Sequence, residues 1–530
     1  MSDYQVIIVG GGPVGLGLGI DLGQRGISVL IIEQYFTRQL IPKGQNMTQR
    51  TGEHFRAWGV SNEISNAKKI KSIGGASGVT SYGTLLGPYH YEWLNRSWVN
   101  SFYANPSVRM PQYVTEFVLR DRVDQLSNVD ILYDWSFTSF SQNKDNISIQ
   151  VEEMSGKKKK NFSAQHLVGC DGAFSLVRSL AGIKQKLDEH RKRMILTVVR
   201  SPPMSALINE QFSNTSFFNV LHKDLDGYWQ FFGRVDEDSR WFFHMPVENN
   251  ATEDSVDVKF LLNRAIGAKF DIEIDYIGFW DLRFAHAENY RKGRVFIAGD
   301  AAHAHPPYGG YGVNMGFEDA RNLSWKLAAS LNGWGNDALL NSYNDERHAV
   351  FSSTRDNFIS KMIKDDAAFL ANYDPERDQS DFENAWAKRA KPQDEVMLYL
   401  PNYAGSSIVK GIGASGAVGK HCFEAKAGYH LAPVELNDGS NIYDLLGKDF
   451  TLILVDSMEN QDEEAQSAAH SLNIPLKVLR VSSSQEVKRW AAKVILVRPD
   501  HFVAYVGENQ MHEMHKILAM ATGQKRMIEA

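Results

Sequence analysis

The segment Gly10-Gly11-Gly12-Pro13-Val14-Gly15 follows directly on the apolar run YQVIIVG and satisfies the spacing G-x-G-x-x-G. Glycines at this spacing allow a tight turn between a strand and a helix, and they let a pyrophosphate approach free N–H groups at the helix start. Glu33 ends the next apolar run, about 20 residues on, where a carboxylate can accept a hydrogen bond from a ribose hydroxyl. The pattern predicts a dinucleotide site but does not by itself separate FAD from NAD.

Two further turns carry acidic groups. Gly169-Cys170-Asp171-Gly172, followed by Ser175 and Arg178, is typical either of a ligand-binding turn or of an ordinary β-turn. In GRVFIAGDAAHAHPPYGGYGVN, residues 293–314, Asp300 stands at the end of an apolar strand. We expect its carboxylate to bind a ribityl or ribose hydroxyl, and the helix start after Gly309, Gly310 and Gly312 to stabilise negative charge.

His303 and His305, in the same segment, could be taken for a pair of metal ligands. They stand two residues apart beside two prolines, and no neighbouring cysteine or carboxylate completes a set. We therefore expect no metal site.

These turns need a βαβ unit to position them. Residues 4–10 and 27–33 are predicted strands, and the helical spacing of residues 16–26 lies between them. Further along, we expect a helix over 112–126, a β-meander over 130–168, an antiparallel aromatic sheet over 193–277, and helices near 315–331 and over 342–371. The pattern of residues 72–110 fits neither a helix nor a long strand. The fold class is α/β, or α+β overall.

The composition narrows the function class. A net charge of −6 gives no reason to expect a nucleic-acid partner, and Lys157–Lys160 is interpreted as a solvated hairpin loop. With only two cysteines, Cys170 and Cys422, and no apolar run long enough to cross a membrane, we expect a cytoplasmic protein in a reducing compartment. We interpret Cys170 as inert packing.

Taken together, the three turns, in this order and at these separations, resemble the class A (single-component) flavoprotein aromatic hydroxylases over essentially the whole chain. The later stretches NMGFEDARNLSWKLA and SYNDERHAV look like the long helices of that family, and ILVRPDHFVAYVG resembles the end of the thioredoxin-like domain of its phenol hydroxylase and polyketide hydroxylase branches. The resemblance implies a Rossmann-like FAD-binding domain, a β-sheet substrate domain and a C-terminal thioredoxin-like domain. No cysteine lies after residue 436, so we expect a structural or dimer-stabilising role for this last part and a homodimer.

The resemblance also implies which residues bind the cofactor. FAD is expected as the bound cofactor, with NADPH or NADH as a transient reductant. Lys43, in Pro42-Lys43-Gly44, stands where the family usually has arginine, so either Lys43 or Arg50 supplies the positive charge. Gln34 replaces a common arginine beside Glu33. The full set of expected FAD contacts is Gly10, Gly12, Pro13, Val14, Gly15, Glu33, Gln34, Lys43, Gln112, Asp171, Asp300, Pro307, Gly312, Val313 and Asn314.

The implied reaction is hydroxylation of a small aromatic, phenolic substrate, by oxygen transfer from a flavin C4a-hydroperoxide formed with NAD(P)H and O2. Pro307, Tyr228 and His244 are the candidate catalytic residues, and Phe231, Asn46 and Thr48 are possible neighbours of the substrate. For Tyr228, Phe231 and His244 a purely structural role is the more frequent one for such side chains.

Three alternatives stay open at this point. A same-family oxygenase could perform epoxidation or Baeyer–Villiger oxidation on a polycyclic or polyketide substrate. The chain could also be a flavoprotein dehydrogenase or halogenase, although the halogenase pattern G-W-x-W-x-I is absent, or a non-catalytic FAD sensor.

The domain division that follows from these expectations has seven segments. They are 1–75, 111–185 and 281–372 for the FAD-binding domain, the last with long helices; 76–110 and 186–280 for the substrate domain; 373–435 for a connector; and 436–530 for the thioredoxin-like domain.

Overall fold

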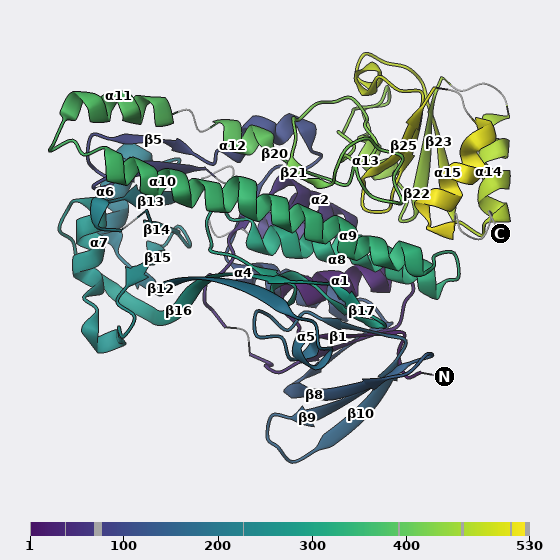
Figure 1. Cartoon of the computed structure of the whole chain (residues 1–530), viewed down its shortest axis with the longest axis horizontal. Helices are drawn as coiled ribbons and strands as arrows, with labels where there is room; N and C mark the ends of the chain where they lie inside the picture. The colour runs from purple at the N-terminus through teal and green to yellow at the C-terminus, as the bar shows by residue number, and fades with distance from the viewer. Residues whose placement is uncertain are drawn as a thin grey trace.

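The computed structural model describes residues 2–37, 39–67, 77–225, 227–390, 393–456, 460–508 and 511–524. Figure 1 shows two long helices crossing the centre of the molecule, a large sheet at one side and the C-terminal unit at the other. The predictions made for residues 72–76 and 525–530 lie outside the described ranges.

A six-stranded sheet carries the glycine-rich turns. Its order is β17-β18-β11-β1-β2-β7, and every neighbouring pair is parallel except β17 with β18. Because carboxyl ends of parallel strands share one edge, the segments that follow β1, β2, β11 and β18 come together. The strands are β1 (Val6–Val9), β2 (Val29–Glu33), β7 (Val129–Tyr133), β11 (His166–Gly169), β17 (Arg291–Lys292) and β18 (Val295–Ile297).

Helices pack on this sheet and extend from it. The predicted run of residues 342–371 is helical throughout, because α9, a short π-helix and α10 follow one another without a break. The helices are α1 (Pro13–Gln24), α2 (Gln49–Ala57), α3 (Ser61–Asn66), α4 (Gln112–Asp124), α5 (Leu176–Leu180), α8 (Gly312–Leu331), α9 (Asp337–Thr354), the π-helix η5 (Arg355–Ile359) and α10 (Ser360–Asn372).

A three-stranded antiparallel sheet projects from the lower edge of the molecule (Figure 1). It contains β8 (Trp135–Gln142), β9 (Ile147–Glu153) and β10 (Lys159–Ala164). Lys157 and Lys158 lie in the turn between β9 and β10, whereas Lys159 and Lys160 begin β10, and all four are exposed. The lysine run is therefore a solvated hairpin, as predicted.

The aromatic segments form an eight-stranded sheet, of order β19-β16-β12-β15-β14-β13-β4-β5. Residues 77–110, whose pattern predicted neither a helix nor a long strand, supply two of its strands, and β4 pairs in parallel with β13 far along the chain. The strands are β4 (Gly78–Tyr82), β5 (His90–Trp93), β12 (Gln185–Arg200), β13 (Phe217–Leu221), β14 (Trp229–Arg234), β15 (Arg240–Val247), β16 (Glu273–Ala287) and β19 (His303–Ala304).

Shorter elements connect the two large sheets. The strands β3 (Asn46–Met47) and β6 (Val108–Arg109) pair antiparallel with each other, so Asn46 lies opposite Arg109. The segment interpreted as a connector, 373–435, contains regular structure as well as loops. It holds α11 (Gln379–Arg389), α12 (Gln393–Leu398), β20 (Tyr399–Asn402) and β21 (Gly416–Val418).

The remaining elements are helices beside the large sheet and single turns. These are α6 (Pro202–Phe212), α7 (Val258–Ile266), η1 (Arg96–Phe102), η2 (Lys223–Leu225), η3 (Glu253–Ser255) and η4 (Gly299–Ala301).

The C-terminal unit is a four-stranded sheet of order β23-β22-β24-β25 with helices at its side. β22 runs parallel to β23 and antiparallel to β24, and β24 runs antiparallel to β25. Its elements are α13 (Ile442–Leu445), β22 (Phe450–Val455), α14 (Gln461–Ser471), β23 (Leu476–Val481), η6 (Val487–Trp490), β24 (Val494–Val497), β25 (Val503–Gly507), η7 (Met511–Glu513) and α15 (Met514–Ala521).

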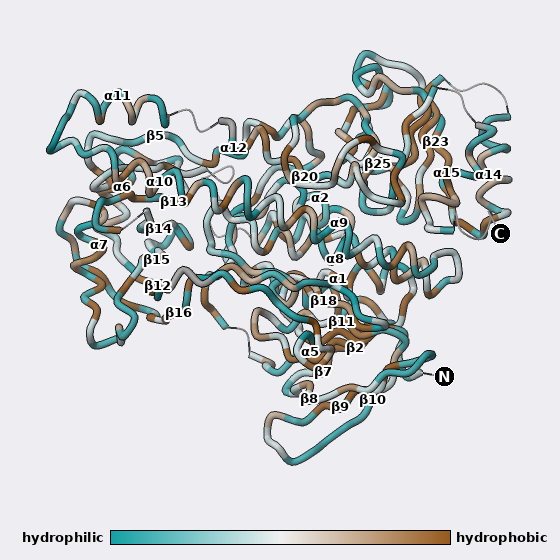
Figure 2. Tube along the Cα trace, viewed as in Figure 1, coloured by the Kyte–Doolittle hydropathy of each residue, from teal (hydrophilic) through white to brown (hydrophobic). Residues whose placement is uncertain are grey.

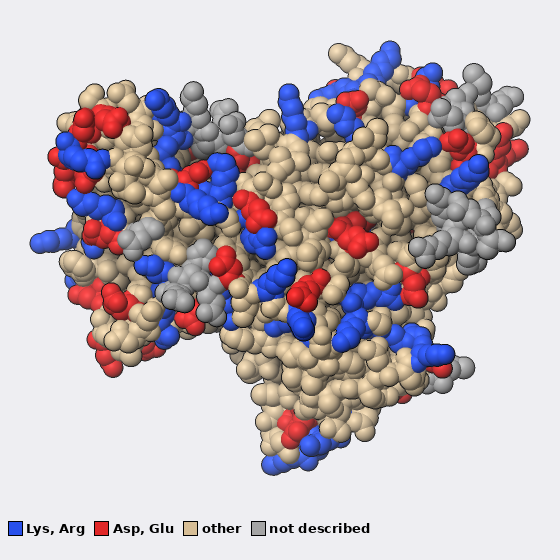
Figure 3. Space-filling model, viewed as in Figure 1, with Lys and Arg blue, Asp and Glu red and all other residues tan. Residues whose placement is uncertain are grey.

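Apolar residues concentrate on the inner strands of each sheet. In Figure 2 the hydrophobic colour marks β2, β11 and β18 of the central sheet and the strands of the C-terminal unit, where Val6–Val9 and Phe450–Leu454 are buried. On the face in Figure 3, acidic and basic side chains are interspersed. None of the helices in the described ranges has the length and apolar composition needed to cross a bilayer.

Candidate active site

Two adjoining cavities lie at the carboxyl edge of the central sheet. The first, which we call the Glu33 cavity, has a volume of about 660 Å³ and is lined by the first glycine turn, Glu33, Gln34 and Asp171. The second, the Asp300 cavity, has a volume of about 400 Å³ and is lined by Asp300 and by residues of the aromatic sheet. Five residues line both cavities, which makes them one elongated site: Gly12, Lys43, Gln112, Cys170 and Gly172.

The first glycine turn fits a phosphate-binding role. A side chain at Gly10 would lie 2.3 Å from the carbonyl oxygen of Cys170, and one at Gly15 would lie 2.0 Å from that of Gly10. A Cβ on Gly12 would meet nothing within 4 Å, so this side of the turn is open. Gly12 also precedes α1 without any side chain capping the helix, which leaves backbone N–H groups free for an anion.

Glu33 lies where the sequence pattern predicted a carboxylate. Its two oxygens accept hydrogen bonds from the N–H groups of Gly11, at 2.7 Å, and Tyr35, at 2.8 Å. These bonds fix the carboxylate at the wall of the Glu33 cavity, directly beside the glycine turn.

Asp300 faces the second cavity. The Asp300 side chain is accessible from that cavity, while protein atoms surround it on its other sides. This burial raises the pKa of the carboxyl group. No residue in the described ranges donates a hydrogen bond to this carboxylate. Asp300 is therefore ready to accept hydroxyl groups of a ligand that enters the cavity.

The start of α8 forms another wall of the Asp300 cavity. Gly312 and Val313 line the cavity, and no side chain caps the helix. Asn314 does not line either cavity. Its side chain accepts hydrogen bonds from the Thr48 N–H and the Thr51 hydroxyl, and donates to the carbonyls of Asn46 and Gly310. The role of the Asn314 side chain is therefore to hold the helix start against the segment before α2.

The Asp171 turn both lines a cavity and forms the hydrogen bonds of an ordinary turn. It lines the Glu33 cavity, but its carboxylate accepts hydrogen bonds from the Ser175 hydroxyl, at 2.5 Å, and the Val177 N–H, at 3.1 Å. Both bonds stabilise the start of α5. Arg178 then donates to the Ala301 carbonyl at 2.7 Å, which ties this turn to the Asp300 segment.

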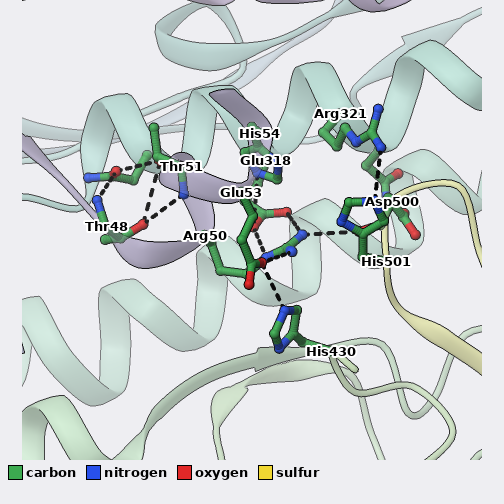
Figure 4. A network of polar contacts seen from close by, with 12 residues as sticks. Thr48, Arg50, Thr51, Glu53, His54, Glu318, Arg321, His430, Asp500 and His501 are labelled. Atoms are coloured by element: carbon green, nitrogen blue, oxygen red, sulfur yellow. Dashed lines mark hydrogen bonds and ion pairs between the residues drawn. The ribbon is translucent and has the colours of Figure 1, made fainter. Parts of the chain in front are cut away.

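Of the two candidates for the positive charge, Lys43 reaches the site and Arg50 does not. Lys43 lines both cavities, and Gln112, which also lines both, accepts a hydrogen bond from the Gly44 N–H. Arg50 points away, into the network of Figure 4, where it binds Glu318 and Glu53 at 2.8 and 2.6 Å and the Asp500 carbonyl at 3.0 Å. Three acceptors occupy its guanidinium, so Arg50 holds the C-terminal unit to α2 and α8.

The aromatic wall of the Asp300 cavity comes from β14 and β15. Phe231, Phe242 and His244 line it, together with Pro307. Burial lowers the pKa of His244 to about 4, and its Nδ1 has no hydrogen-bond partner in the described ranges. His244 is therefore neutral at pH 7.

Tyr228, the other candidate catalytic residue of the aromatic sheet, does not lie at this wall. It precedes β14, lines neither cavity and stacks on Trp229 with ring centroids 6.0 Å apart. Side chains alternate between the faces of an extended chain, so residues three apart, such as Tyr228 and Phe231, point in opposite directions.

Three residues at the site were missed or assigned otherwise from the sequence. Cys170 lines both cavities, although burial raises the pKa of its thiol and keeps it unreactive. His305 lines the Asp300 cavity with an unpartnered Nε2. Arg109 also lines the Asp300 cavity and ends a strand of only two residues. A strand this short shows no alternation of polar and apolar residues in the sequence. In the described ranges, no cluster of three or more histidine, cysteine or acidic residues could hold a metal ion.

Comparison with known families decides the cofactor. Residues 3–357 match the family model described as "FAD binding domain", and residues 424–524 match the model "Aromatic-ring hydroxylase, C-terminal". The first match covers all three glycine-rich turns. The chain belongs to the FAD-dependent aromatic-ring monooxygenases.

This monooxygenase is similar to several named monooxygenases in sequence and in structure. It is 28% identical to the 4-methyl-5-nitrocatechol 5-monooxygenase of Burkholderia sp over 95% of this chain and 94% of that protein. It is 30% identical to the rifampicin monooxygenase of Streptomyces venezuelae over 67% of this chain and 70% of that protein. The crystal structure of the flavin-dependent monooxygenase PieE in complex with FAD and substrate has the same fold, with a TM-score of 0.86 at 22% identity over 99% of this chain and 100% of that one.

The two cavities of this FAD-dependent monooxygenase fit the two halves of its cofactor. The open side of Gly12 and the uncapped start of α1 suit a pyrophosphate, the unpartnered Asp300 suits a polyhydroxyl chain, and the uncapped start of α8 suits a ring that gains negative charge. When bound, FAD would accept a hydride and activate O2.

Proposed function

We propose that this monooxygenase hydroxylates a small phenolic ring compound, with NADPH or NADH as reductant and O2 as the oxygen source. The observation that carries the proposal is the division of the Asp300 cavity. The groups suited to FAD, namely Asp300, Lys43 and the start of α8, form one part of its wall, and Phe231, Phe242 and His244 form another. A planar substrate between the two parts is held by aromatic contacts and kept from bulk water.

We propose that the FAD contacts are those expected from the sequence, with two changes. Gly10, Gly12, Pro13, Val14, Glu33, Gln34, Lys43, Gln112, Asp171, Asp300, Pro307, Gly312 and Val313 line the two cavities, which supports direct contact. Gly15 and Asn314 are proposed to act by shaping the two helix starts instead.

His244 is the proposed proton acceptor for the phenol. His244 lines the cavity, and a neutral imidazole there can take a proton from a bound hydroxyl group, which makes the ring more nucleophilic. Pro307 is proposed to border the ring.

The test uses the purified, FAD-loaded protein. Oxidation of NADPH and NADH is followed with and without a panel of phenols, and products are analysed by mass spectrometry after reaction with isotopically labelled O2. We expect one or more phenols to stimulate oxidation and to gain one labelled oxygen atom. Stimulated oxidation that yields only hydrogen peroxide with every phenol would refute the hydroxylation.

A second candidate is oxidation of a larger, polycyclic substrate by epoxidation or Baeyer–Villiger insertion. The similarity to a relative named rifampicin monooxygenase favours it. Product structure separates the two, because ring-oxygen insertion or epoxidation leaves no new phenolic hydroxyl group.

For the C-terminal unit we infer a thioredoxin-like fold with a structural role. The order β23-β22-β24-β25, with α14 between the two parallel strands, supports the inference, and the unit contains no cysteine for redox chemistry. We also propose a homodimer and the domain division given above. Light scattering on the purified protein tests the oligomeric state.

A further inference from the structure

Arg109 differs from most buried arginines of this chain. Five others pair with a carboxylate at 2.5 to 2.8 Å: Arg25, Arg50, Arg321, Arg347 and Arg498. Arg109 is 4% exposed, and no carboxylate in the described ranges forms an ion pair with it. An unpaired buried charge is costly. Arg96, Arg178 and Arg234 are also buried without an ion pair in the described ranges, and backbone carbonyls accept their hydrogen bonds. Of these four arginines, Arg109 is the one that lines the Asp300 cavity.

Neutral groups hold the Arg109 guanidinium in place. Nη1 donates to Asn46 Oδ1 at 2.5 Å, and Nη2 donates to the Arg234 carbonyl at 2.7 Å and to Gln45 Oε1 at 3.2 Å. A Cβ on Gly233 would lie 2.9 Å from Nη2, so the absence of a side chain there leaves room for the guanidinium. Nε has no partner in the described ranges.

A second arginine, Arg234, adds positive charge near Arg109. Arg234 is also buried without an ion pair in the described part of the chain, and it donates to the Thr215 carbonyl and to Asn209. Burial and Arg234 lower the pKa of Arg109 to about 9, which leaves it protonated at neutral pH.

The position of Arg109 connects this charge to the substrate. It lines the Asp300 cavity beside Phe242, with the guanidinium 5.6 Å from the centroid of that ring, and Phe231 and His244 line the same wall. A ring compound that packs on this wall would bring a substituent toward the guanidinium.

We propose that Arg109 recognises a carboxylate on the aromatic substrate. The inference rests on the proposed function and narrows it, because it requires that the ring compound carry a negative charge when bound. Arg109 is the residue that selects for charge, while the aromatic wall selects for shape.

The test measures binding in the FAD-loaded enzyme without reductant, by perturbation of flavin absorbance. The probes are matched pairs of hydroxylated aromatic acids and their amides with one, two or three rings, since acid and amide have the same shape. We expect the wild-type enzyme to bind at least one acid about tenfold or more tightly than its amide, as charge-assisted hydrogen bonds do. Arg109→Met should reduce this preference to about twofold or less, and Arg109→Lys should keep part of it.

Arg122→Met is the matched control. Arg122 also binds only neutral acceptors, the Trp58 carbonyl and Gln125 at 3.0 Å each, and lies outside both cavities. Circular dichroism and flavin content confirm that each variant folds. The control should keep the wild-type preference.

Three results would overturn the proposal: equal binding of acid and amide by the wild-type enzyme, an unchanged preference in Arg109→Met, or no binding of any pair at millimolar concentration. A lower flavin reduction potential in Arg109→Met with an unchanged acid preference would show that Arg109 serves the reduced flavin instead. Failure of the proposed function is a separate outcome, in which acids bind as expected but no ring compound gains oxygen.

Discussion

Arg498 and Glu346 form a fully buried, two-point ion pair, with Nη1–Oε1 and Nη2–Oε2 distances of 2.6 and 2.9 Å. Arg498 belongs to the C-terminal unit and Glu346 to α9, so the pair joins the two family-matched parts of the chain. Lys326 of α8 also binds Glu346, at 2.7 Å. Burial alone would raise the pKa of Glu346, but the two cations outweigh it and hold the pKa well below its ordinary value.

Glu346→Gln should destabilise the protein by about 3–5 kcal/mol, because it removes the carboxylate partner of the buried Lys326 and leaves the buried Arg498 with Asp500 alone. Urea unfolding monitored by circular dichroism measures the change. Lys410→Met, which removes a solvent-exposed pair with Glu513 in the same unit, is the control and should leave the midpoint unchanged. Equal midpoints for Glu346→Gln and the control would contradict the account of the network.

Gly12→Ala should weaken FAD binding while leaving the apoprotein as stable as the wild type. The added methyl group meets no protein atom within 4 Å but projects from the turn where a pyrophosphate would approach. Flavin content after gel filtration and thermal unfolding of the apoprotein test both parts. Gly447→Ala, whose added Cβ makes ordinary contacts outside both cavities, is the comparison. Full flavin retention by Gly12→Ala would place the pyrophosphate elsewhere.

Asp300→Asn should weaken FAD binding about tenfold or more, since hydrogen bonds to a charged group contribute about 1.5–3 kcal/mol. The amide keeps the size of the side chain and loses the charge. Equilibrium dialysis of FAD measures the affinity, with Asp462→Asn in the exposed part of α14 as control. An affinity equal to that of the control would remove Asp300 from the cofactor site.

His244 should make the unfolding free energy depend on pH between about 6.5 and 4. Burial lowers its pKa in the folded protein to about 4, so the unfolded chain binds more protons below the unfolded-state pKa near 6.5. Stability from this residue is complete above pH 6.5 and decreases as the pH falls toward 4, by at most about 3 kcal/mol.

His244→Phe should flatten this dependence, measured by denaturant unfolding of the holoenzyme at a series of pH values. The exposed His470→Gln variant should follow the wild type. Identical slopes for wild type and His244→Phe would show that His244 is not kept neutral by the fold.

The sequence predicted those parts of the site that depend on local geometry. A glycine turn between a strand and a helix, and an aspartate at the end of a buried strand, are set by neighbours in the chain, so Gly12 and Asp300 lie where expected. Arg109 and Tyr228 depend on tertiary pairing instead. Arg109 reaches the cavity through the two-residue pairing with Asn46, and no periodicity signals a strand of that length.

The same limit applies to the larger sheet. β4 lies beside β13 in parallel register, with Gly78 opposite Phe217, across more than a hundred residues of chain. Such pairing follows from the packing of whole layers and leaves no local pattern. The choice between Lys43 and Arg50 likewise required the position of the C-terminal unit, whose Asp500 carbonyl accepts a hydrogen bond from Arg50.

The residues that line the two cavities extend from Val9 to Val313. A ribosome delivers the first glycine turn early, but Asp300 and the start of α8 emerge some three hundred residues later, and Arg498 near the end. The growing chain therefore cannot complete the two cavities before residue 313 of 530 has been made, and the contact of Arg498 with Glu346 follows only near the end of synthesis.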